Sequence, residues 1–143
     1  MSSLVYFDSS AMAKVFWKEA GTERVLHILS EAEAAASVSL AYVELISATF
    51  RASRRGDVPS SDVAGVLEAI RRSWDDIIEI PVDDSLIREA SELVRRHPLR
   101  AYDALHLAAA LRWQALMGEP VLFVAFDKDL LDAARDEGLP TAQ

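Results

Sequence analysis

Short apolar runs, each long enough for a strand and too short for a helix, set the strongest limit on the fold of this chain. Residues 4–7 (LVYF) and 121–126 (VLFVAF) are continuous apolar segments, and each is followed at once by an aspartate. Such runs are typical of strands buried on both faces of a parallel sheet. Residues 34–38 and 77–82 predict two further strands, although Pro81 limits the ladder of the second or marks its end.

Helical patterns separate these strands. We expect Ser9 or Ser10, Thr22 and Ser39 to cap helices, because short hydroxyl side chains are favoured at N-caps. Seven helices are expected: 9–19, one that starts at 22, 40–55, 59–74, one from 83 or 84 to the residue before Pro98, 101–117 and 129–137. Residues 139–143 are expected to form a brief edge strand or a frayed end. Strands that alternate with helices predict a three-layer α/β/α sandwich with a central parallel sheet. The 143 residues show no linker or internal repeat, so we expect one domain spanning residues 1–143.

The composition excludes several classes of protein. No apolar stretch approaches the ~20 residues of a membrane span, the first three residues carry no basic signal, and cysteine is absent, so a cytoplasmic location is expected. The net charge of −8 argues against a protein that coats nucleic acid by charge alone. Positive charge is nevertheless concentrated in two clusters, Arg51, Arg54 and Arg55, and Arg95, Arg96 and Arg100. Each cluster is interpreted either as a solvated helix end or as a set of phosphate contacts.

Four acidic residues lie next to core-forming sequence: Asp8, Glu44, Asp103 and Asp127. An ionised carboxylate in such a place is costly unless it is compensated. Asp8 and Asp127 follow strands, and ligands of parallel α/β sheets bind outside the carboxyl ends of the strands. A shared hard cation, Mg²⁺ or alternatively Mn²⁺, would compensate all four, which predicts metal-dependent chemistry on phosphate.

Four segments carry a resemblance to a known family: LVYFDSSA at 4–11 with Lys14 and Glu19, Glu44 in its helix, YDALHLA at 102–108, and FDKDL at 126–130. In order and spacing they resemble the PIN-domain ribonucleases, and more narrowly the VapC-type toxins of toxin–antitoxin pairs. The resemblance implies a metal-dependent endoribonuclease that hydrolyses RNA through a metal-activated water. It implies Asp8 and Asp103 as principal Mg²⁺ ligands, with Glu44 and Asp127 completing the catalytic site, a cognate antitoxin as partner, and a homodimer.

Single residues near these motifs have alternative interpretations. Ala125 stands where the family often has a hydroxyl, so Asp129 is an alternative to Asp127 as the last acid. His106 is interpreted as a packing or hydrogen-bonding residue, with a general base or an RNA contact as the alternative. Ser9 either caps its helix or orients the site, and Trp17 either joins the core or lines a groove for a partner.

The sequence is also compatible with functions other than that of a toxin. A catalytically silent PIN-like interaction module or a housekeeping RNA-processing nuclease would share the fold. A phosphate-accepting receiver-type domain also groups acids at strand ends, but the placement of Glu44 and Asp103 inside helices disfavours it.

Overall fold

A five-stranded, fully parallel sheet forms the centre of the computed structural model, which describes residues 3–143. The strand order is β3-β2-β1-β4-β5. The strands are β1 (Leu4–Phe7), β2 (Ala34–Val38), β3 (Ile78–Ile80), β4 (Val121–Val124) and β5 (Thr141–Ala142). β1 lies between β2 and β4, and all four of its residues are buried.

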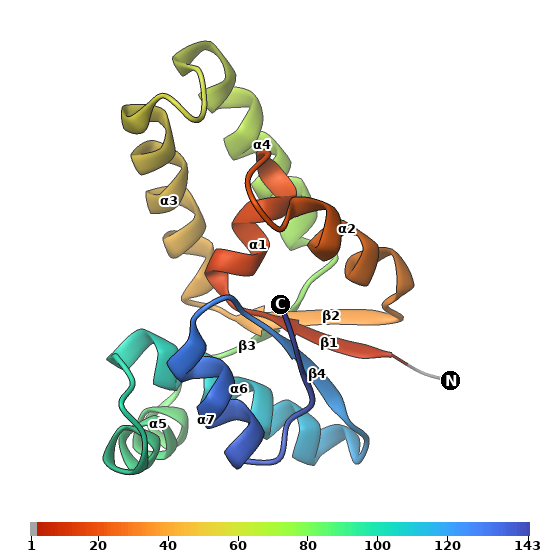
Figure 1. The fold of residues 1–143 in the computed structure, drawn as a ribbon, viewed down its shortest axis with the longest axis vertical. Coiled ribbons are helices and arrows are strands. Elements are labelled where there is room, and N and C mark those ends of the chain that lie inside the picture. The colour runs from red at the N-terminus through yellow and green to blue at the C-terminus, as the bar shows by residue number, and fades with distance from the viewer. Residues whose placement is uncertain (1–2) are drawn as a thin grey trace.

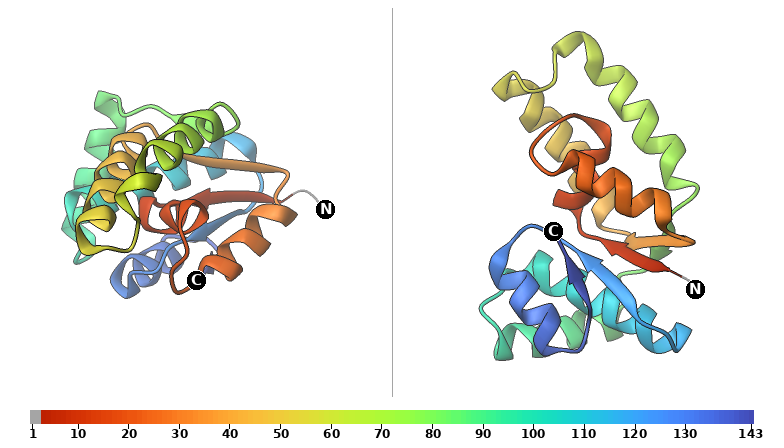
Figure 2. Two further views of the ribbon diagram at one scale, coloured as in Figure 1. Left: turned by 90° about the horizontal axis from the view of Figure 1, so that it is seen from above. Right: turned by 45° about the vertical axis from the view of Figure 1, so that its right-hand side comes forward.

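Helices cover both faces of the sheet (Figure 1). One layer holds α1 (Ser9–Phe16), α2 (Thr22–Glu31), α3 (Ala41–Arg55) and α4 (Val63–Trp74), the last preceded by the 3-10 turn Ser60–Asp62. The other layer holds α5 (Asp84–Arg96), α6 (Ala101–Met117) and α7 (Lys128–Asp136). The right-hand view in Figure 2 shows the same separation, which confirms the predicted three-layer sandwich. None of the helices among the described residues is both long and apolar enough to cross a membrane.

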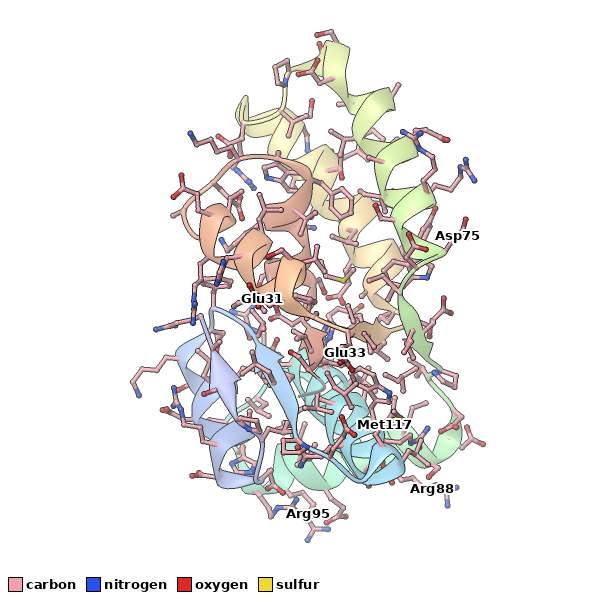
Figure 3. The ribbon with its side chains drawn as sticks, turned by 90° about the vertical axis from the view of Figure 1, so that its right-hand side faces the viewer. Glu31, Glu33, Asp75, Arg88, Arg95 and Met117 are labelled. Carbon is pink, nitrogen blue, oxygen red and sulfur yellow. The ribbon has the colours of Figure 1, made fainter. Side chains whose placement is uncertain are left out.

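The core is continuous from the sheet into both helical layers. Tyr6 is fully buried at the centre, and its ring stacks on Phe123 of the neighbouring strand with centroids 5.5 Å apart. Charged side chains such as Arg88, Arg95 and Asp75 point outward from the ribbon (Figure 3). Burial of this apolar surface is the main favourable contribution to folding.

The ends of several elements differ from the expectation. The N-cap of α1 is Asp8, whose Oδ1 accepts a hydrogen bond from the Ala11 N–H at 2.8 Å, so the capping by Ser9 or Ser10 expected from the sequence was wrong. The expected hydroxyl caps of α2 and α3 were also wrong, since their N-caps are Gly21 and Leu40. Helix α1 ends at Phe16, and β3 and β4 are shorter than predicted.

Candidate active site

The four acids predicted from the sequence line one cavity of about 370 Å³ at the carboxyl end of the sheet. Asp8 follows β1 and Asp127 follows β4, while Glu44 and Asp103 lie in the first turns of α3 and α6. Four segments far apart in the sequence therefore converge, because adjacent parallel strands end at the same edge and their helices start there.

Asp8 forms the buried floor of this cavity. Its Oδ1 accepts hydrogen bonds from the Ala11 N–H and the Ser10 hydroxyl, both at 2.8 Å, and no described residue donates to Oδ2. Burial raises the pKa of Asp8, and the charge of Glu44 adds to the rise, although His106 and the two hydrogen bonds oppose it. Asp8 is thus a helix cap and also presents one free carboxylate oxygen to the cavity.

Asp103 and Asp127 face Asp8 from the other helical layer. Partial burial raises the pKa of Asp103, and the charges of Asp127 and Asp8 raise it further. Asp127 caps α7 through Oδ1, which accepts from the Leu130 N–H at 2.9 Å. Asp129, the alternative last acid, is exposed and is not among the residues that line the cavity.

Glu44 is held in place by two partners. Its Oε1 accepts from the Ser9 hydroxyl at 2.5 Å and lies 2.9 Å from His106 Nε2. Burial opposes ionisation of Glu44, but the hydrogen bonds from His106 and Ser9 and the charge of Arg51 outweigh it, so the pKa of Glu44 is lowered. Ser9 therefore fixes Glu44 and does not cap α1, whose N-cap is Asp8. Its role in orienting a functional site stays a prediction.

A buried chain of hydrogen bonds holds His106 in position against Glu44. The Val38 N–H donates to the Tyr6 hydroxyl at 3.1 Å, and the hydroxyl lies 2.8 Å from His106 Nδ1. Burial raises the pKa of Tyr6 well above 10.0, so the phenol stays a neutral donor. We assign the tautomer in which Tyr6 donates to Nδ1 and the Nε2–H points to Glu44. With both nitrogens engaged and its side chain buried, His106 has the hydrogen-bonding role expected from the sequence.

Three arginines border the cavity. They are Arg51 and Arg55 on α3 and Arg100 just before α6. The other members of the two sequence clusters lie outside it: Arg54 does not line the cavity, Arg95 contacts Glu92, and Arg96 binds Glu137 at 3.1 Å. Sequence reasoning could not separate them, since that depends on the direction in which each side chain leaves its helix.

The donor chemistry suits a hard divalent cation. Carboxylate oxygens are the ligands that Mg²⁺ and Mn²⁺ prefer. A cation would offset both the burial and the repulsion between carboxylates that raise the pKa values of Asp8 and Asp103. Within residues 3–143, however, no three His, Asp or Glu side chains are already arranged so that they could hold a metal ion together. Mg²⁺ usually takes only one or two protein carboxylates and completes its shell with water and substrate oxygens, so a preformed group of three ligands is not needed.

Comparisons with known proteins agree with this geometry. The PIN domain family matches residues 5–136. Ribonuclease VapC45 of Mycobacterium tuberculosis strain CDC 1551 and ribonuclease VapC49 of strain H37Rv are each 34% identical to the chain over 144 aligned positions, which cover 97% of this chain and 94% of each relative.

Two solved structures share the fold. The crystal structure of FitAcB from Neisseria gonorrhoeae superimposes with a TM-score of 0.69 at 13% identity, over 98% of this chain and 97% of that one. FitAB bound to an IR36 DNA fragment gives 0.68 at 12% identity, over 97% and 94%. With its three-layer fold and its acidic cavity at the strand ends, the chain belongs to the PIN domain family, and within it to the group of the VapC ribonucleases.

Proposed function

We propose that this protein is a metal-dependent endoribonuclease and the toxin of a toxin–antitoxin pair. The observation that carries the proposal is the convergence of four carboxylates and three arginines on one cavity. Acids alone would suit a cation site of any kind, but guanidinium groups around them also suit a phosphate ester. Two relatives that match nearly the whole chain are named ribonucleases, which supports RNA as the substrate.

Asp8 and Asp103 would be the principal ligands of Mg²⁺, or alternatively Mn²⁺, with Asp127 completing the pocket. When bound, such an ion supplies Lewis acidity and an activated nucleophile for phosphodiester hydrolysis. Glu44 is tied to Ser9 and His106 through Oε1, so Oε2 is the oxygen it has left for the reaction centre. The helix dipole at the first turn of α6 opposes the rise in the pKa of Asp103 that burial and the neighbouring carboxylates cause.

The remaining residues of the cavity bind and orient the RNA. Arg51, Arg55 and Arg100 lie on its walls, where they can hold the negative charge of the backbone on either side of the scissile bond. The chain of Tyr6, His106 and Ser9 keeps Glu44 in one orientation. A fixed carboxylate needs no reorganisation during the reaction, which is how preorganised groups lower a barrier.

RNA cleavage by the purified protein with Mg²⁺ or Mn²⁺, compared with EDTA, tests this proposal. Asp8→Asn keeps the shape of the side chain and removes its charge, so it is expected to abolish cleavage while the protein stays folded. Cleavage that persists undiminished in EDTA would refute the metal dependence. A protein that cleaves no RNA but binds a partner would instead be a catalytically silent interaction module.

The proposed activity requires an inhibitor in the cell. We propose a cognate antitoxin that inserts an Arg or Lys among Asp8, Glu44 and Asp103 and so competes with the cation. Expression of the chain alone in the cytoplasm is then expected to arrest growth, and co-expression of a short neighbouring gene product is expected to restore it. Normal growth with abundant protein would favour a housekeeping RNA-processing nuclease.

A homodimer is the further partner we propose. Val43 and Tyr102 are each 57% exposed. With Leu40 they form the apolar part of a second cavity of about 310 Å³, whose other lining residues are Glu44, Ser47 and Arg51. Exposed apolar surface shared by two helices is typical of an interface. Val43→Glu is expected to convert a dimer into a monomer in light scattering, and a monomeric unsubstituted protein would refute the dimer.

A further inference from the structure

The cavity continues from its acidic floor into a groove between α1 and α3. Residues at helical spacing form its two sides: Ser9, Ala13 and Trp17 on one, and Glu44, Ala48, Arg51 and Arg55 on the other. The two helices pack against each other, and eight residues at about 1.5 Å each carry the α1 side roughly 12 Å from the floor. The far end of the groove is therefore bordered by the Trp17 indole ring and by Arg55, whose Nε pairs with Asp57 Oδ2 at 3.0 Å. Arg51 lies one turn nearer the floor, where its Nη1 donates to the Ser47 hydroxyl at 2.7 Å.

Trp17 is held rigidly at this end. It follows the last turn of α1 in an extended conformation and is half-buried. Its indole N–H donates to Glu19 Oε2 at 3.1 Å, and Glu19 Oε1 accepts from Lys14 Nζ at 3.0 Å. Since the single polar atom of the indole is already bonded within the protein, the ring offers the cavity an apolar surface.

The segment from Lys14 to Gly21, which carries Trp17 and Glu19, packs against Phe126 on the opposite side of the site. Lys14 Nζ lies 4.4 Å from the centre of the Phe126 ring, next to Asp127. Gly21 has φ +94°, and a Cβ there would come within 2.9 Å of Phe126. The ring of Trp17 is thus placed by contacts that reach across to the β4–α7 connection, and little ordering entropy remains to be lost when a ligand packs on it.

We propose that Trp17 stacks on a nucleobase of single-stranded RNA, next to phosphates held by Arg51 and Arg55. This inference rests on the proposed nuclease function and adds a residue that holds an unpaired base near the cleavage site. An aromatic surface beside guanidinium groups is the combination that recognises an unpaired strand. Ala13 and Ala48 have side chains too small to fill the groove between them and the floor, which leaves room for the backbone to pass.

A protein side chain is the other possible occupant of this end of the groove. The lining does not favour it, because apart from Trp17, Ala13 and Ala48 the groove is bordered by charged and polar side chains. An apolar anchor of a protein would need a dry pocket. A base can stack on the ring while its edges and phosphates stay in contact with water and arginine.

The test is the affinity of two short single strands for the Asp103→Asn protein in Mg²⁺. One strand is a mixed-sequence RNA, and the other is an abasic ribose-phosphate strand of the same length and charge. Trp17→Leu and Trp17→Met are expected to weaken RNA binding about tenfold, the loss typical of one stacked base, and to change abasic-strand binding less than twofold. Trp17→Phe is expected to stay within about threefold of the unsubstituted protein.

Phe50→Leu is the matched control, since Phe50 is an exposed aromatic residue of α3 that does not line the groove. Quenching of tryptophan fluorescence by RNA gives a second measurement, and it is expected in the unsubstituted protein and absent from Trp17→Phe.

Equal weakening of the binding of both strands would refute stacking. Unchanged RNA affinity in Trp17→Leu and Trp17→Met, with cleavage intact in the unsubstituted protein, would refute the stacking role of Trp17 but not the nuclease function. The end of the groove would then be left to a protein partner. Failure of the unsubstituted protein to bind or cleave RNA would overturn the nuclease proposal, and this inference with it.

Discussion

Removing a single buried hydroxyl group, by Tyr6→Phe, is expected to destabilise the protein and loosen its acidic site. The hydroxyl joins the Val38 N–H to His106 Nδ1, and both partners are buried. Each buried polar group left without a partner costs about 1–3 kcal/mol. The lost hydroxyl also no longer needs desolvation, so we expect a net loss of about 2–4 kcal/mol. At roughly 3 °C per kcal/mol for a domain of this size, the melting temperature falls by about 6–12 °C.

Urea denaturation followed by circular dichroism measures this loss, and an unchanged m-value would show that the unfolded state is unaffected. Tyr42→Phe is the matched control, because no described residue hydrogen-bonds to the Tyr42 hydroxyl, and we expect it to change the stability by less than ~0.5 kcal/mol. In a His106→Leu background, Tyr6→Phe is expected to cost about 1 kcal/mol less, because one unpaired partner is gone. A Tyr6→Phe protein as stable as the unsubstituted protein would refute the hydrogen-bond chain.

Three further outcomes follow from the site and its surroundings. Asp103→Asn is expected to abolish RNA cleavage at saturating Mg²⁺ while the circular dichroism spectrum is retained; full activity would remove Asp103 from the metal site. Arg51→Glu is expected to weaken RNA binding and to lower its salt slope by about 0.7 per lost phosphate contact, whereas Arg54→Glu, outside the cavity, has little effect in the same titration. Hydrogen bonds from His97 and Arg96 lower the pKa of Glu137 below 4.5, so their stabilisation is present above that pH and is lost as the pH falls through the folded-state pKa. Glu137→Gln is therefore expected to reduce the melting temperature at pH 7 and not at pH ~2, and an equal reduction at both would contradict this account.

The acids of the site were predictable because each leaves a local signal. Asp8 and Asp127 follow apolar runs, and the alternation of strands and helices places the ends of those runs together. The same local rules failed at the helix starts, where Asp8 caps α1 in place of the neighbouring hydroxyls. An aspartate that follows a strand directly is already at the position where the helix begins, so it precedes any serine in reach of the free N–H groups.

The remaining features depend on contacts between distant segments. Helix α1 ends at Phe16, and the following turn is fixed by Lys14 against Phe126, which lies more than a hundred positions along the chain. The pairing of Tyr6 with His106 and the choice of Arg51 over Arg54 as a cavity residue likewise depend on how the helices pack. Periodicity identifies the buried face of a helix but does not identify the residue that faces it.

The position of β4 beside β1 has a consequence for the time at which the protein becomes harmful. Leu4 pairs with Val121, so β1 has no partner on that side until the ribosome has added more than a hundred further residues. Asp127 follows that late strand, so it joins the cavity lined by Asp8, Glu44 and Asp103 only when β4 has formed. A nascent chain therefore has no complete acidic cavity, and truncated products of interrupted translation lack it too. A cell translating this message is therefore exposed to the proposed nuclease only after Asp127 has been synthesised, which gives a co-synthesised inhibitor time to be present first.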